Sequence, residues 1–557
     1  MPLVEAEIAA PAGRSRAASG RQHLALWIAC IVLSLPFCSR PYYVDDHYHV
    51  TMAEGLLHDP ARPYDFRSDD TMEDAAGWVS GEPPRMVNPP VMHYFLAAAM
   101  ALFGSDESRL RLVYLIFPLI SISGILALAR RLCSRPVWAA WLALVCPVFW
   151  LNSSSLLIDM AILPFAVWGL ELFLRGWEKD GSGLSLWAGS ALLGLAPLVK
   201  YTAYPFLLLA PAWVWIEDPC FRSRIGKLKC MIAPLLISLA WCLWTAALYG
   251  EPHITAAWKR PLSGVLWIKT FSGFSFLGGA TGFALAFLPL AALRHPRVAF
   301  SFGSFAVVLA YFYTTPLGGF SADPAILLSL FQSSALVMLA LFLILRRNLN
   351  RMAQIWMWGY LLLLHVPMPW LAARYYLVLI PPLACLAVDS VRFSFASERP
   401  FRFVMVLLIV GTGSLSAVLA TEERIEAETQ SRIAEDVARD PIISAETGGK
   451  RFVGDSFFGF NHYLRRKGWT PVWNQADLRP GDLVLSPTNS IPATIRRGWT
   501  LPTETIREFR YDSPLPVRLN SLECGAAFYA SAGGAFPYAF STRPTEVFVV
   551  MKVLEPR

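Results

Sequence analysis

Thirteen apolar segments, most of them close to the thickness of a bilayer in length, constrain the fold of this chain more than any other feature. A helix needs roughly 20 apolar residues to cross a bilayer. Only 16% of the 557 residues are charged, against about 25% in soluble proteins. The pattern predicts an all-α polytopic membrane protein with about thirteen transmembrane helices. The expected spans are residues 23–39, 110–129, 136–152, 156–174, 184–199, 201–216, 230–250, 271–293, 298–315, 323–345, 352–366, 371–389 and 403–420.

The basic residues between these segments predict the orientation in the membrane. If residues 1–22 form a cytoplasmic tail, the connections on that side hold about 20 Lys and Arg, whereas the short loops on the other side hold five. This ratio of 4:1 agrees with the positive-inside rule. Thirteen spans then place the C-terminus outside the cytoplasm. The same placement accounts for the net charge of +7 without a nucleic-acid partner.

Two polar regions are expected on the outer side. Residues 40–109 form a long first loop, in which "NPPVMHYFLAAAMALFG" reads as a helix lying at the interface, with a full span as the alternative. Residues 421–557 begin with an amphipathic helix, "ERIEAETQSRIAEDVARD", and continue with four short strands, "RFVGDSF", "GDLVLSP", "IREFRYD" and "EVFVVMKVL". The chain is therefore divided into a tail (1–22), a transmembrane domain (23–420) and a small C-terminal α/β domain (421–557).

Ionisable and polar residues gather at the outer ends of the predicted spans. Charges next to apolar segments are costly, so they indicate a functional site by default. Their common placement on one side of the membrane is stronger evidence than any one of them. They are Asp45, Asp46, His47, His49, Arg85, Asn88, Asp159, Lys200, Tyr201, His253, Lys259, Arg260, Arg374, Tyr375 and Tyr376.

Each of these residues also has a purely structural interpretation. Asp46 and its histidine neighbours fit a solvated acidic loop. Asp159 in "NSSSLLIDMAILPF" fits a helix cap. Lys200 fits a side chain that extends from the interface into water. Arg374 and Tyr375 fit an anchor at the edge of the bilayer. The sequence leaves these alternatives open.

Several motifs resemble one family of membrane enzymes. "VDDHYHVTMAEGLL" and "NPPVMHYFLAAAMALFGSDESRLRLVY" are similar to segments of the polyprenyl-phosphate-sugar-dependent glycosyltransferases. This family has the GT-C fold and includes the bacterial aminoarabinose transferases that act on lipid A and the protein O-mannosyltransferases. "SLLIDMAILPF", "GLAPLVKYTAYPFLLLAP" and "ARYYLVLIPPLACLAV" resemble later motifs of the family, in the same order. The resemblance covers roughly residues 25–390.

The resemblance implies a role for individual residues. Asp45 corresponds to the catalytic carboxylate after the first span, and Asp46 completes the acidic pair. Asp159 corresponds to a second-loop acid, so these three aspartates are the catalytic residues that the resemblance implies. Lys200 and Arg374, with Tyr375 beside them, correspond to the site for the donor phosphate. The residues implied for the substrate loop are Arg85, Asn88 and Tyr94.

The chain departs from the lipid A branch at one position of consequence. That branch carries a Glu-Lys pair before its Pro-Pro, and the Glu helps to hold a metal ion. Here the two residues are Val87 and Asn88. His253 is the remaining candidate metal ligand, and dependence on a divalent metal is left open.

The function implied is transfer of a sugar from a polyprenyl phosphate to a lipid, glycan or protein acceptor at the outer face of the bacterial cytoplasmic (inner) membrane. In this scheme Asp45 is the general base and the family habit is inversion. The partners expected are the lipid-linked sugar, the acceptor and membrane lipids. The rival hypothesis is a transporter or flippase, but such proteins place polar sites near the bilayer midplane and carry internal repeats, which this sequence does not show.

Overall fold

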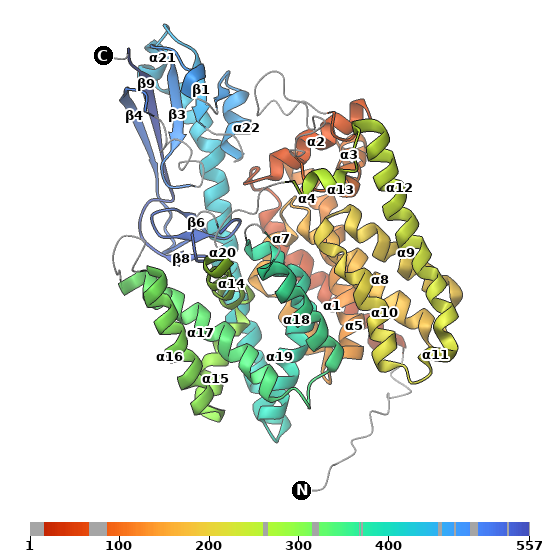
Figure 1. Ribbon diagram of the computed structural model, residues 1–557. Coiled ribbons are helices and arrows are strands. Elements are labelled where there is room, and N and C mark those ends of the chain that lie inside the picture. The colour runs from red at the N-terminus through yellow and green to blue at the C-terminus, as the bar shows by residue number, and fades with distance from the viewer. Residues whose placement is uncertain are drawn as a thin grey trace.

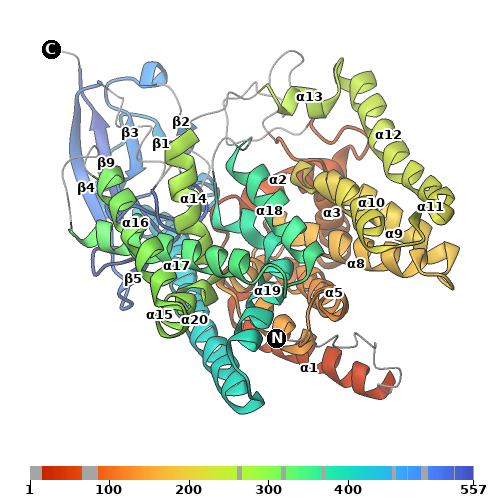
Figure 2. The same cartoon turned by 60° about the horizontal axis from the view of Figure 1, so that its bottom comes forward.

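The structure is a computed structural model. It describes residues 16–65, 86–259, 266–314, 322–366, 368, 371–454, 459–472, 475–490, 500–531 and 534–555. A large bundle of helices is joined at one end to a small domain that contains a β-sheet (Figure 1). In both overall views the sheet lies on one side of the molecule and helices α9 and α12 lie on the opposite side (Figure 2). The chain is therefore largely helical with a small C-terminal α/β part, as the sequence predicted.

The expected spans all coincide with helices, several of which are interrupted or short. The helices of the bundle and of the first loop are α1 (Arg16–Ser34), α2 (Asp46–His58), α3 (Val91–Phe103), α4 (Glu107–Tyr114), α5 (Ile116–Leu132), α6 (Pro136–Leu144), α7 (Pro147–Ser153), α8 (Asp159–Trp177), α9 (Gly183–Leu195), α10 (Pro205–Glu217), α11 (Phe221–Arg224), α12 (Ile232–Tyr249), α13 (His253–Ala257), α14 (Leu266–Thr281), α15 (Phe287–Arg294), α16 (Pro296–Thr314), α17 (Ala322–Ile344), α18 (Arg351–His365), α19 (Ile380–Ser394) and α20 (Glu398–Arg439).

Within the described residues, seven helices are long and apolar enough to cross a membrane. The count rises to nine if two bent pairs are each one span. These are α6 with α7, bent by 60°, and residues 272–281 of α14 with η5 (Phe283–Ala286) and α15, bent by 91°. The first bend lies at Pro147, which cannot donate a backbone hydrogen bond within a helix. The structure supports a multi-pass membrane protein but not the count of thirteen.

The outer surface of the bundle is apolar, as a surface in contact with lipid must be. Large hydrophobic side chains on α12 and on the first half of α20 are exposed, among them Leu235, Leu243, Phe403 and Val410. Soluble proteins rarely expose so continuous an apolar face. The core lies between the helices instead, around α5, α8 and α19, where most apolar side chains are buried.

Helix α20 continues from the bundle into the C-terminal region without a break (Figure 1). The sequence predicted a span at 403–420 and a separate amphipathic helix after it, whereas the structure has one helix of 42 residues. The junction, "LATEERIEAE", contains no Gly or Pro and consists mostly of strong helix formers, so nothing terminates the helix there. The boundary expected at residue 420 therefore falls inside a helix.

The C-terminal domain is built on a five-stranded sheet in the order β2-β1-β3-β9-β4. Strands β1 and β2 are parallel, as are β1 and β3, whereas β9 is antiparallel to β3 and to β4. All four strands predicted from the sequence are confirmed, and they correspond to β1, β3, β4 and β9. The elements of the domain are α21 (Pro441–Ala445), β1 (Arg451–Gly454), α22 (Gly459–Arg465), β2 (Thr470–Val472), β3 (Leu483–Pro487), β4 (Thr503–Tyr511), β5 (Val517–Arg518), β6 (Asn520–Ser521), β7 (Ala526–Ala527), β8 (Ala539–Phe540) and β9 (Glu546–Val553).

The first loop folds over one end of the bundle through α2 and α3, which pack against each other. Helix α3 has 13 residues, fewer than a span requires, and ends at Gly104, whose φ of 81° favours glycine. This length fits the interfacial helix that the sequence predicted rather than a full span.

Candidate active site

The chain turns sharply between the first span and α2, and two adjacent carboxylates follow this turn. Val44 has a φ of 49°, a left-handed conformation that is unfavourable for a β-branched residue. Strained backbone of this kind persists only where surrounding contacts enforce it, and it is concentrated at functional sites. Asp45 follows at the N-cap of α2, and Asp46 is the first residue of the helix. The two side chains have entirely different surroundings.

Asp45 forms an ion pair with Arg374, which is 329 residues away in the sequence. Both terminal nitrogens of the guanidinium lie 3.1 Å from Oδ2 of Asp45. The side chain of Asp45 is 30% exposed, whereas that of Arg374 is 12% exposed. Among the described residues, no hydrogen-bond donor contacts Oδ1 of Asp45. One oxygen of this carboxylate is thus held by Arg374, and the other has no hydrogen-bond partner among the described residues.

Asp159 extends this pair into a cluster of four charged residues. It begins α8, and its Oδ1 accepts a hydrogen bond of 2.7 Å from Nζ of Lys200. Its Oδ2 lies 3.5 Å from Nε of Arg374. The side chains of Asp159 and Lys200 are 5% and 9% exposed. Two carboxylates and two cations therefore alternate in the order Asp45, Arg374, Asp159 and Lys200, and the charges balance within a nearly closed environment.

Tyr375 packs beside the two cations. Nζ of Lys200 lies 4.2 Å from the centre of the Tyr375 ring, and the guanidinium carbon of Arg374 lies 5.9 Å from it. Arg374 and Tyr375 belong to the short helix η7 (Ala373–Leu379), which leads into α19. Aromatic faces attract cations at this range, so Tyr375 helps to hold both of them in place.

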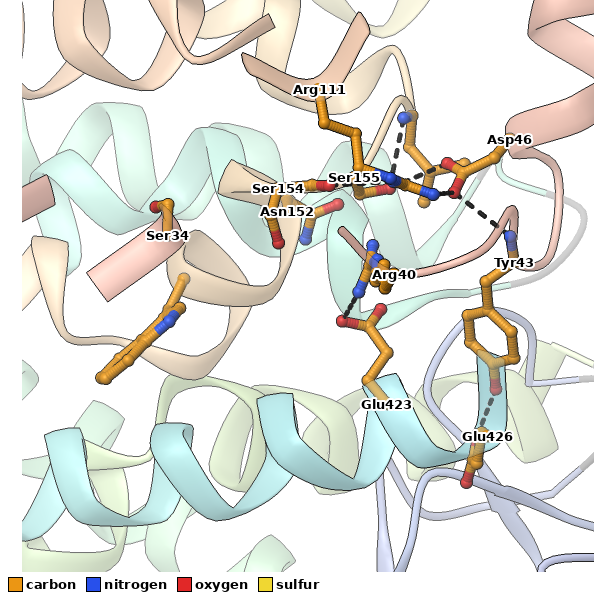
Figure 3. Close-up of polar contacts among 12 residues, drawn as sticks. Ser34, Arg40, Tyr43, Asp46, Arg111, Asn152, Ser154, Ser155, Glu423 and Glu426 are labelled. Carbon is orange, nitrogen blue, oxygen red and sulfur yellow. Dashed lines mark hydrogen bonds and ion pairs between the residues drawn. The ribbon is translucent and has the colours of Figure 1, made fainter. Parts of the chain in front are cut away.

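Asp46 is completely enclosed and has a different set of partners from Asp45. Figure 3 shows its carboxylate turned toward Arg111, with Tyr43 and Ser155 around it. Arg111 Nη2 donates to Asp46 Oδ2 at 2.7 Å, and the backbone N–H of Leu156 donates to Oδ1 at 2.9 Å. Burial alone would raise the pKa of Asp46, but Arg111 outweighs it and holds the pKa below its usual value. These contacts indicate that Asp46 fixes the loop rather than meeting a substrate.

Two buried histidines of the first loop contact each other, and one of them, His49, follows Asp45 on α2. Nδ1 of His49, one turn after Asp45 on α2, is 3.0 Å from Nε2 of His93 on α3. Burial lowers the pKa of His49 to about 4 and that of His93 well below its usual value. Both rings are therefore neutral at pH 7, and one must donate to the other. The sequence singled out His49 but not His93, which lies within an apolar helical pattern.

His253 is held by hydrogen bonds on both ring nitrogens, which does not fit a metal ligand. Nε2 lies 3.0 Å from the carbonyl oxygen of Met86, so Nε2 must carry the proton. Nδ1 then accepts from the hydroxyl of Tyr201 at 2.7 Å, and that hydroxyl accepts from Nε1 of Trp241 at 3.0 Å. Within the described residues, no group of three His, Cys, Asp or Glu side chains is arranged to hold a metal ion. His253 instead fastens the first loop to α12.

Two residues of the predicted substrate loop, Asn88 and Tyr94, lie in this neighbourhood. The backbone carbonyl oxygen of Asn88 accepts a hydrogen bond of 3.0 Å from the hydroxyl of Tyr64, and the Tyr64 ring stacks on His253 with 4.3 Å between the ring centres. Tyr94 donates to the carbonyl oxygen of Pro60 at 2.5 Å. These contacts order the loop but do not connect it to the charged cluster. Arg85 lies outside the described residues.

The sequence did not indicate that the C-terminal region also reaches the cluster. The guanidinium carbon of Arg374 lies 5.9 Å from the ring of Tyr529, whose hydroxyl bonds to Glu423 of α20. Glu423 also pairs with Arg40, five residues before Asp45 (Figure 3). Pairs that are hundreds of residues apart leave no local signal in one sequence. The one hint of these contacts in the sequence was the cluster of Glu422, Glu423 and Glu426. All three are buried in the structure, and buried carboxylates require partners.

Comparisons with known proteins agree with the resemblance seen in the motifs. Residues 87–244 match the sequence profile of the family "Dolichyl-phosphate-mannose-protein mannosyltransferase". Over these residues the match agrees with the resemblance of the motifs to membrane glycosyltransferases. A search of curated protein sequences gives no match.

Solved structures of low sequence identity also align with the chain. ArnT from Cupriavidus metallidurans in the apo state is 15% identical, with a TM-score of 0.45, and the alignment covers 97% of this chain and 100% of ArnT. The archaeal oligosaccharyltransferase AglB from Archaeoglobus fulgidus, in complex with an inhibitory peptide and a dolichol-phosphate, is 12% identical, with a TM-score of 0.45, and the alignment covers 86% of this chain and 71% of AglB.

Proposed function

We propose that this protein transfers a glycosyl group from a polyprenyl-phosphate sugar to a lipid, glycan or protein acceptor at the outer face of the bacterial cytoplasmic membrane. The N-terminus is cytoplasmic and the C-terminus lies outside. The family match over residues 87–244 supports the class of donor. The pairing of Asp45 with Arg374 is the observation that carries the proposal, because it places a carboxylate with one open oxygen beside a fixed cation.

Asp45 is the general base of this reaction. An acceptor hydroxyl gives its proton to the carboxylate of Asp45 as its oxygen bonds to the anomeric carbon of the sugar. The bond between that carbon and the phosphate oxygen breaks at the same time, and the polyprenyl phosphate leaves with the electron pair. A single displacement of this kind inverts the anomeric carbon. Of the four charged residues, Asp45 is the most exposed, which suits the one that must meet the acceptor.

Arg374 and Lys200 bind the donor phosphate and stabilise the charge that develops on it as it leaves. Both cations are held by Asp159 and by the ring of Tyr375, so little reorganisation is needed during the reaction. In this scheme Asp159 orients the cations, and Asp46 supports the loop that carries Asp45. The sequence had grouped all three aspartates as catalytic, and the proposal keeps only Asp45 in that role.

The experiment is a transfer assay with the purified protein in detergent or nanodiscs, using synthetic polyprenyl-phosphate sugars that carry a hexose or an aminopentose. We expect the wild type to release polyprenyl phosphate and to glycosylate an acceptor, and Asp45→Asn to lower turnover by about 10²- to 10⁴-fold. Asp59→Asn, at the exposed end of the same helix, is the matched control and keeps wild-type turnover.

Two results would overturn the proposal. Near-normal turnover in Asp45→Asn would remove Asp45 as the base. Movement of the donor lipid across a vesicle membrane by the wild type, with no release of its sugar, would replace the glycosyltransferase with a flippase.

A further inference from the structure

The C-terminal domain is bonded directly to the segment that carries Arg374. The backbone N–H of Ala373 donates to the carbonyl oxygen of Phe528 at 2.9 Å, and the N–H of Ser531 donates to the carbonyl oxygen of Leu371 at 2.7 Å. The Ser531 hydroxyl oxygen also accepts from the N–H of Leu371 at 3.0 Å. The two segments therefore run side by side, and Tyr529 stands next to Arg374.

The guanidinium of Arg374 lies near two tyrosine rings from distant parts of the chain. Its carbon is 5.9 Å from the ring centres of Tyr375 and of Tyr529. Tyr375 is its neighbour in the sequence, whereas Tyr529 comes from the turn after β7 and is 2% exposed. A cation near a desolvated aromatic face is attracted to it. The second ring therefore restricts where the guanidinium can lie.

The orientation of Tyr529 is itself fixed by residues of α20 and of the first loop. Its hydroxyl donates to Glu423, a buried residue of α20 that is also paired with Arg40. Arg40 lies at the exit of the first span, close before Asp45. Figure 3 shows Arg40 and Glu423 facing each other between α20 and the first loop. The ring of Tyr43, from the same loop, packs edge-on against Tyr529 at 5.8 Å.

We infer that Tyr529 is a positioning residue for Arg374, so that the C-terminal domain completes the donor-phosphate site. This inference rests on the proposed function, because it assigns Arg374 to the phosphate. The ring holds the guanidinium at the edge of the cluster, and Glu423 holds the ring. The domain is then part of the site itself, in addition to any role in acceptor binding.

The test measures binding of a synthetic polyprenyl monophosphate without sugar, together with the donor KM and kcat, in purified full-length variants. Tyr529→Leu removes the ring, and we expect the Kd for polyprenyl phosphate and the donor KM to rise by about threefold to thirtyfold, with the acceptor KM unchanged. Tyr529→Phe keeps the ring but loses the bond to Glu423, so we expect its donor affinity to lie between those of Tyr529→Leu and the wild type. Tyr529→Met, which fills the space without a ring, replaces Tyr529→Leu if that variant does not fold.

Tyr538→Leu is the matched control, because Tyr538 is equally buried in the same domain but packs on Phe331 at 4.9 Å instead of on Arg374. We expect it to lower the thermal midpoint without changing donor affinity. Equal effects of Tyr529→Leu and Tyr538→Leu on the Kd would overturn the inference alone and leave the proposed function intact. Failure of the wild type to bind polyprenyl phosphate would overturn both.

Discussion

We expect Asp46→Asn to destabilise the folded protein much more than Asp45→Asn does. Oδ2 of Asp46 accepts from Arg111 at 2.7 Å and from the N–H of Tyr43 at 3.2 Å. Oδ1 accepts from the N–H of Leu156 at 2.9 Å and from the Ser155 hydroxyl at 3.3 Å. An amide that keeps its oxygen toward Leu156 presents an NH₂ group to two donors. The variant therefore loses two hydrogen bonds and leaves the Arg111 guanidinium buried without a counter-charge.

The magnitude follows from the burial of the pair. The Asp46 and Arg111 side chains are both 0% exposed, and breaking such a pair costs about 3–5 kcal/mol. An unfolding entropy of about 2.1 cal/mol/K per residue gives roughly 1.2 kcal/mol/K for this chain, so the thermal midpoint should fall by about 3–4 °C. Asp45→Asn affects a partly exposed pair whose arginine keeps Asp159, and it should cost about 1 kcal/mol or less.

The assay is thermal unfolding of the purified variants followed by the fluorescence of the 20 tryptophans, over a range of pH. Because the pKa of Asp46 is lower in the folded state, its contribution is present above the unfolded pKa of about 3.9 and is lost as pH falls through the folded pKa. The gap between wild type and Asp46→Asn should thus be constant from pH 5 to 8 and narrow below about pH 4. A midpoint of Asp46→Asn within 1 °C of wild type at pH 7 would refute the structural role.

Three further predictions follow from the contacts of single residues. Arg374→Ala should raise the donor KM as well as lower kcat, because a phosphate-binding cation acts both before and during departure of the leaving group, and a loss of kcat alone would contradict this role. Addition of Zn²⁺ should leave the thermal midpoint of the wild type unchanged, because both ring nitrogens of His253 are bonded; a rise that His253→Gln abolishes would show that the histidine binds metal. Burial raises the pKa of Glu546 to about 7, so the folded state loses stability as pH rises from about 4.3 toward 7. The thermal midpoint of Glu546→Gln, measured relative to that of the wild type, should therefore rise as the pH is raised from 5 to 8. A difference in midpoint that does not change with pH would contradict the raised pKa.

The sequence by itself predicted the helical membrane region, the strands of the C-terminal domain and the charged residues that meet. Apolar runs and alternating strand patterns are local signals, because each residue contributes to them regardless of distant partners. The convergence of Asp45, Asp159, Lys200 and Arg374 was predicted because all four lie at span ends on one expected side of the membrane. In the structure they form one continuous set of ion pairs.

Only the tertiary structure decided which partner each charged residue has and how deeply it is buried. In the sequence only the family resemblance distinguished Asp45 from Asp46, whereas in the structure Asp46 is enclosed with Arg111 and Asp45 is partly exposed beside Arg374. It also divided α20 at the membrane boundary and gave no role to Tyr529. Burial of a charge depends on partners brought together from far along the chain, and a single sequence carries no record of that distance.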